Sequence, residues 1–298
     1  MNKTIFIKFF QLSIISIPVL LLTGPFMPDL AISLTSIIFI LFYSKELIQL
    51  IKKEKVILFF FMFWIYLVIS SLFSDHILYS LKSSALYIRF IIFSAVFYYL
   101  ISFNSGILEL FLNFLKIAIY LMCAASLFEF FFEFNLYLND KPTLRLTGTY
   151  KDEQIVGSFL SKIFPIYISL ILYLNKKLNA EFFVISLLTF LIVFLSNERT
   201  AIFFTISFFM FFVLIYPKFN LKKKLIGIFT VIFFIFTIIF SVEDVKGRTI
   251  DLTLSQMGVF LFKSQDKPEY SNYKKNNERL FVFSRSHEIH ALTALNMF

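Results

Sequence analysis

The sequence predicts an all-α polytopic membrane protein with about nine transmembrane helices. Of its 298 residues, 59% are hydrophobic, with 45 Phe and only 7 Gly, and the mean hydropathy is +0.82. Soluble globular domains do not have this composition. Apolar runs repeatedly reach the ~17–25 residues that a helix needs to cross the hydrocarbon core. Lysines collect in the short segments between these runs, as they do in cytoplasmic loops.

Each predicted span is an apolar run bounded by charged or turn-forming residues. The first starts with the basic "MNKTIFIKFF" and lacks a clear small-x-small cleavage site, so it is interpreted as a span and not as a signal peptide. The second lies between "TGPFMPD" and "SKELIQLIKKEK". The predicted spans are 5–22, 30–43, 56–73, 83–103, 107–132, 155–174, 181–196, 200–216 and 225–241.

The loops predict a cytoplasmic N-terminus and a periplasmic C-terminal tail. With this orientation, "SKELIQLIKKEK", "NKK" and "PKFNLKKK" all fall on the cytoplasmic side, as the positive-inside rule requires. Residues 1–241 then form the transmembrane domain. Residues 242–298, which contain "KSQDKPEYSNYKKNNERLF", form the start of a large periplasmic loop.

Composition and motifs exclude several function classes. The net charge of +9 comes from lysines that flank spans, so it does not indicate nucleic acid as a partner. Cys123 is the single cysteine, which leaves no partner for a disulfide and favours a packing role. His287 and His290 are too few ligands for a zinc site, and we expect no metal. Walker, GxGxxG and GxSxG motifs are absent from the sequence.

Four cations are placed where a charge is costly. Arg89 and Lys162 lie about six and seven residues inside predicted spans, Arg145 lies in the outer loop before the sixth span, and Arg199 opens the eighth. A charge at membrane depth costs roughly 2.5–3.5 kcal/mol. One interpretation is that each side chain reaches the headgroups independently. The other is a cationic pocket at the periplasmic leaflet that binds an anionic lipid headgroup.

Carboxylates provide the opposite charge in the same regions. Glu129 and Glu133, four residues apart on one helix face, could orient the arginines or bind a sugar. Glu109 and Lys116 lie on one face of the fifth span and could pair there. Residues 152–153 (Asp-Glu) are expected to cap the start of the sixth span.

Three segments together resemble the O-antigen ligase and O-antigen polymerase superfamily of bacterial envelopes. The first is "RLTGTYKDEQIVGSFLSKIFPIYISLIL", which begins at Arg145, and the second is "FLSNERTAIFF", whose S-x-x-R-T-A pattern opens a span. The third is the terminal "HEIHALTALNMF". The resemblance covers roughly residues 30–298 and implies a multi-helix membrane fold in the bacterial inner membrane.

The resemblance also implies an activity. Such enzymes transfer a glycan from an undecaprenyl diphosphate carrier to a hydroxyl of lipid A core or of another lipid-linked glycan, with neither cofactor nor metal. Family arginines hold the diphosphate. By motif position these would be Arg199 and Arg145, with Arg285 a looser match, and Arg89 and Lys162 are added from their location.

One departure from the family pattern leaves alternatives open. In relatives a loop with an H-x-H-N-like motif follows the "alxMF" helix and carries the candidate base, but this chain ends at Phe298. The expected catalytic histidine therefore lies beyond the sequence, and His287 and His290 precede its position. The alternatives are an inactive fragment of the transferase and a polysaccharide or lipid transporter of the flippase kind.

Overall fold

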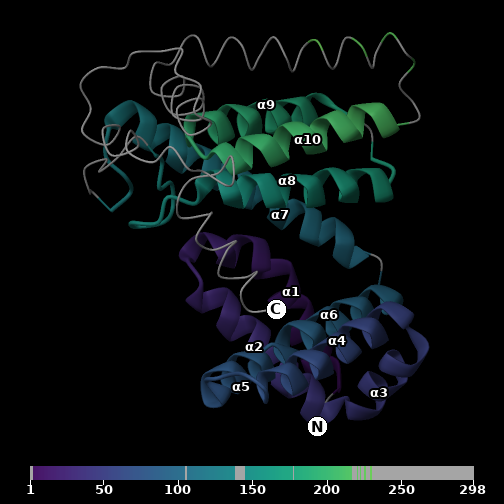
Figure 1. Ribbon diagram of the computed structural model, residues 1–298. Coiled ribbons are helices and arrows are strands. Elements are labelled where there is room, and N and C mark those ends of the chain that lie inside the picture. Colours follow the sequence, from purple (N-terminus) through teal and green to yellow (C-terminus); the bar gives the residue numbers. More distant parts are fainter. Residues whose placement is uncertain are drawn as a thin grey trace.

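The computed structural model describes residues 3–104, 106–137, 145–176 and 178–216, with isolated positions beyond them. Within these ranges the regular elements are all helices (Figure 1). The ninth predicted span, 225–241, and the tail 242–298 with Arg285, His287 and His290 fall outside the described ranges.

Ten α-helices and one short 3-10 helix make up the described chain. Their bounds are α1 Lys3–Leu20, η1 Leu21–Thr23, α2 Phe26–Phe42, α3 Ser44–Lys53, α4 Lys55–Ser71, α5 Ile77–Leu86, α6 Ile88–Phe103, α7 Gly106–Phe132, α8 Val156–Tyr173, α9 Ala180–Leu195 and α10 Arg199–Ile215. The eight predicted spans within the described ranges each correspond to a helix or a helix pair. Their ends differ from the prediction by a few residues at most positions.

Four helical segments are long and apolar enough to cross a membrane, or five if α2 and α3 form one bent span. The four are Ile5–Thr23, Ile77–Phe103, Gly106–Phe132 and Val156–Tyr173. Helices α4, α9 and α10 are apolar but have only 16 or 17 residues. At 1.5 Å per residue they reach about 24–26 Å, just under the ~30 Å hydrocarbon core. The total of nine spans and their orientation stay predictions.

The fourth span begins earlier than its sequence indicates. A boundary at residue 83 follows from the polar run at Ser80–Ser84, but the structure continues the helix back to Ile77 as α5. The Ser84 hydroxyl donates to the Ser80 carbonyl at 2.7 Å, and Trp64 of α4 donates its indole N–H to the Ser84 carbonyl at 3.0 Å. Satisfied hydroxyls are compatible with an apolar environment, and this explains the longer helix.

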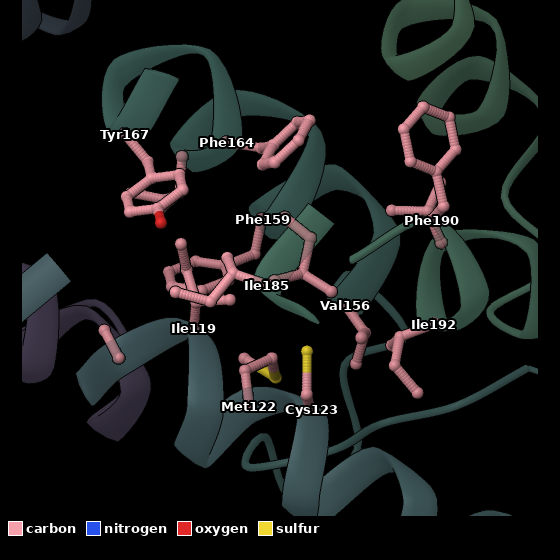
Figure 2. Packing of buried hydrophobic residues seen from close by; sticks show 14 of the residues in the cluster. Ile119, Met122, Cys123, Val156, Phe159, Phe164, Tyr167, Ile185, Phe190 and Ile192 are labelled. Atoms are coloured by element: carbon pink, nitrogen blue, oxygen red, sulfur yellow. The ribbon is translucent and has the colours of Figure 1, made fainter. Parts of the chain in front are cut away.

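The helices pack around two hydrophobic clusters. The larger joins α7, α8, α9 and α10, and Figure 2 shows side chains of α7, including the buried Cys123, facing those of α8 and α9. The smaller is built mainly from α1, α2, α6 and the start of α7. Cys123 therefore has the packing role that the sequence predicted.

Polar contacts show which helix ends lie together. The Tyr150 hydroxyl donates to the Leu21 carbonyl at 3.0 Å, so the segment before α8 meets the end of α1. We call this the site end. It holds the end of α7, the start of α8 and the α9–α10 junction, which lie toward the left of Figure 1.

The opposite end carries two ion pairs between helices. Lys116 of α7 contacts both oxygens of Glu181 of α9 at 2.9 and 3.2 Å, and Lys176 contacts Glu109 at 2.7 Å. Both pairs line a cavity of about 240 Å³. The predicted pairing of Glu109 with Lys116 is therefore wrong. Seven residues along one helix are about 10 Å, too far for a direct contact, whereas the neighbouring helices offer closer partners.

The burial of Tyr150 predicts that the protein loses stability at alkaline pH. Burial, together with the negative charge of Glu153, raises the pKa of Tyr150 to about 12. Because the folded state favours the neutral phenol, this contribution is fully present below pH ~10, the pKa of an exposed tyrosine, and is lost as pH rises towards 12. We expect the thermal midpoint of Tyr150→Phe to fall less than that of the wild type between pH 10 and 12. Exposed Tyr79→Phe is the control, and an identical pH profile for all three proteins would contradict the assignment.

Candidate functional site

Glu198 caps a helix other than its own. It is the residue before α10, yet its carboxylate accepts hydrogen bonds from the first turn of α8. Oε1 accepts from the Gly157 N–H at 2.7 Å, and Oε2 accepts from the Ser158 N–H at 3.0 Å and the Ser158 hydroxyl at 2.5 Å. Glu198 is only 6% exposed. These bonds join the start of α8 to the α9–α10 junction.

The local sequence makes this close approach geometrically feasible. A Cβ on Gly157 would lie 2.4 Å from Ser196 Oγ and 3.1 Å from Glu198 Cβ, so only glycine fits there. Asn197 adopts a left-handed backbone (φ 58°), which asparagine tolerates better than most residues. The turn directs the Glu198 side chain towards α8.

Glu129 holds the other motif segment in the same way. Near the end of α7 and fully buried, its carboxylate accepts the Thr147 N–H at 2.8 and 3.0 Å, the Gly148 N–H at 2.7 Å and the Thr147 hydroxyl at 3.2 Å. Gly148 has φ 59°, and a Cβ there would approach Met122 Sδ to 2.8 Å and a Val156 methyl to 2.9 Å. The "RLTGTY" turn is thereby packed between α7 and the start of α8.

Three of the predicted cations lie on the segments that these carboxylates hold. Arg199 is half-buried and is the first residue of α10, directly after Glu198. Arg145 is half-buried and precedes Thr147 by two residues. Lys162 is exposed and lies one helical turn after Ser158, on the same face of α8. Arg145, Lys162 and Arg199 thus lie on segments that meet at the start of α8.

Arg89 has a different environment. It is the second residue of α6 and lies 12 residues after Ile77, where the span begins. Its guanidinium contacts Asp29 of α2 at 2.8 Å and the Ser33 hydroxyl at 3.3 Å, and it lies over the Phe90 ring at 4.9 Å. Its charge is therefore matched by Asp29 between α2 and α6. Arg285 falls outside the described residues.

Sequence reasoning missed the roles of Glu198 and Glu129. The expected cap of α8 at residues 152–153 is wrong, since both are exposed and Glu198 supplies the acceptor. One signal was available: Ile155, at the N-cap position of α8, has no side chain that can accept a hydrogen bond, so an acceptor had to come from elsewhere. Glu133 is exposed and does not share the role of Glu129.

The carboxylates of Glu198 and Glu129 lie where the backbone N–H groups of α8 and of residues 147–148 would otherwise attract an anion. The start of a helix and a turn with converging N–H groups are both favourable anion sites. At α8 and at residues 147–148 these N–H groups are bonded to Glu198 and Glu129. Recognition of an external anion at this end consequently depends on the cationic side chains.

Comparison with known proteins does not assign this chain to a family. No protein-family model, curated protein or solved structure matches this chain. Among the described residues, no group of three His, Cys, Asp or Glu side chains is placed to hold a metal ion. The chemistry of the site therefore has to follow from its own residues.

Glu198→Ala should destabilise the protein. The substitution leaves the Gly157 and Ser158 N–H groups buried without their acceptor, and we expect a loss of about 2–3 kcal/mol. Thermal or denaturant unfolding in detergent micelles measures this change. Glu133→Ala removes an exposed carboxylate from the same end and serves as the control, with an expected effect within about 0.5 kcal/mol. Equal stability of the two variants would refute the capping role.

Gly157→Ala should also destabilise the protein, by disturbing the contact between α8 and the α9–α10 junction. A methyl group there collides with Ser196 and comes within 3.0 Å of Ala201 Cβ, which separates α8 from the α9–α10 junction. Overpacking of this kind costs about 1–3 kcal/mol. Gly106→Ala is the matched control, because a Cβ at Gly106 meets only the Asn104 side chain. Circular dichroism melting compares the two, and a Gly157→Ala midpoint equal to that of the control would contradict the tight contact.

Proposed function

We propose that the site end binds the diphosphate of an undecaprenyl-linked glycan through Arg199, assisted by Arg145 and Lys162. The chain then transfers the glycan to an acceptor hydroxyl, of lipid A core or of another lipid-linked glycan, in assembly of an O-antigen or related polysaccharide. The proposal also places the protein in a bacterial inner membrane with this end towards the periplasm.

The observation that carries the proposal is the position of Arg199. A cation at the first residue of a helix opposes the helix dipole, whose positive pole lies there. Helix stability therefore does not account for arginine at this position. Glu198, the adjacent acid, is already committed to α8 by three hydrogen bonds. Binding of an external anion would explain why an arginine follows Glu198 at this position.

The proposed reaction uses these cations to stabilise the leaving group. The acceptor oxygen forms a bond to the anomeric carbon, the bond from that carbon to the diphosphate oxygen breaks, and the acceptor proton passes to a base. Undecaprenyl diphosphate leaves with the negative charge that develops on its oxygen. Cations held in place before the reaction lower the energy of that charge, which is usually a large catalytic contribution.

Arg199→Ala should weaken lipid diphosphate binding. A charge-assisted hydrogen bond contributes about 1.5–3 kcal/mol, so we expect affinity to fall roughly 10- to 100-fold. Arg199→Lys should recover only part of this, because an ammonium lacks the planar fork that grips two phosphate oxygens. Binding of undecaprenyl diphosphate and undecaprenyl monophosphate to the purified protein in nanodiscs measures both effects. Release of free undecaprenyl diphosphate from the glycan-linked donor, on addition of acceptor, measures transfer.

The matched control is Lys176→Gln, which removes one positive charge from the opposite end. It should bind the diphosphate lipid as the wild type does. Unchanged binding by Arg199→Ala, or an equal loss in both variants, would overturn the proposed site. Normal binding with no donor cleavage would keep the site and reject the transfer reaction.

A further inference from the structure

Helix α3 runs nearly at right angles to the helix that precedes it. The axes of α2 and α3 differ by 98°, with a single residue, Tyr43, between them. The Tyr43 ring is buried, stacks on Phe39 at 5.5 Å and meets Phe10 and Tyr99 edge-on. These contacts fix the bend. If α2 crosses the membrane, α3 lies along its surface, and at ten residues, about 15 Å, it is too short to cross.

The two sides of α3 differ in polarity. Leu47 and Leu50 pack against the smaller hydrophobic cluster. Lys45, Lys52 and Lys53 are exposed. The helix is followed at once by α4, whose first residue, Lys55, is exposed as well. The basic side is therefore free of helix packing, and it lies beside two apolar helices.

The two glutamates of this segment, Glu46 and Glu54, lie near tyrosines. Glu54 interacts electrostatically with Tyr98 of α6. Glu46 is half-buried and interacts electrostatically with Tyr43 and Tyr99. Both carboxylates thus have a tyrosine neighbour on α6. Four exposed lysines, three on α3 and Lys55 directly after it, outnumber the two half-buried glutamates, so the exposed surface of this segment is basic.

We propose that α3 lies in the membrane interface and that its exposed lysines bind the headgroups of anionic phospholipids. Lysines clustered next to apolar helices attract the anionic headgroups of a membrane surface. Ile48 is 52% exposed and is available to enter the headgroup–acyl boundary. Each lysine close to an anionic surface strengthens attraction by roughly fivefold. This inference is independent of the proposed diphosphate site, which lies at the other end of the helices.

Two variants with the same net charge test the proposal. The first combines Lys45→Gln, Lys52→Gln and Lys53→Gln. The control combines Lys8→Gln, Lys82→Gln and Lys151→Gln, three exposed lysines outside α3. Each protein is reconstituted in nanodiscs of mixed phosphatidylglycerol and phosphatidylcholine, and the ratio of the two lipids retained on the purified protein is measured by mass spectrometry. We expect enrichment of phosphatidylglycerol to fall roughly tenfold or more in the α3 variant and to change little in the control.

A depth measurement supplies a second, independent result. Ile48→Cys in a Cys123→Ala background carries one fluorescent label, since Cys123 is the chain's single cysteine. We expect quenching by lipids brominated near the headgroup to exceed quenching by lipids brominated near the chain end. Equal lipid enrichment in both lysine variants, or a label quenched best at the centre of the bilayer, would overturn the proposal.

Discussion

A chain in hydrocarbon must satisfy its backbone polar groups internally, because no water is available to do so. Helices meet this requirement except at their ends and at turns. At the site end, buried N–H groups in the first turn of α8 and at residues 147–148 need an acceptor from another part of the chain. Glu198 and Glu129 accept from these groups across 41 and 19 residues of sequence. The arrangement of α7, α8, α9 and α10 at this end depends on the two carboxylates.

The same contacts also fix the cations. Arg199 follows Glu198 directly, and Arg145 comes shortly before the turn held by Glu129. Lys162 lies on α8, whose start Glu198 caps. Binding groups placed on a backbone already held by hydrogen bonds lose less conformational freedom when a ligand arrives. In the proposed function, the two carboxylates therefore contribute to diphosphate binding by holding the backbone that carries these cations.

Hydropathy was sufficient to locate helices in the eight predicted spans that fall in the described residues, because a long apolar run permits only a helix in lipid. It did not locate α3 as a separate helix or extend the fourth span through Ser80–Ser84. Both depend on contacts with neighbouring helices, such as those of Tyr43 and Trp64. The motifs assign Arg145 and Arg199 to one site, and this stays a prediction. The partners of Glu129, Glu198 and Lys116 could not be read from spacing along one chain, because they lie on other elements.

The two ends of the molecule differ in how their charges relate to the helix dipoles. At the opposite end, Glu109 and Glu181 lie in the first turns of α7 and α9, and Lys176 follows the end of α8. Each of these three charges is favourable at its end of the helix, and each has an oppositely charged partner on another element. Helix stability therefore explains their positions. At the site end Arg199 opposes the dipole of α10. The helix dipole therefore explains the charges at the opposite end but not the arginine at the start of α10, and the proposed diphosphate site is built on Arg199 for that reason.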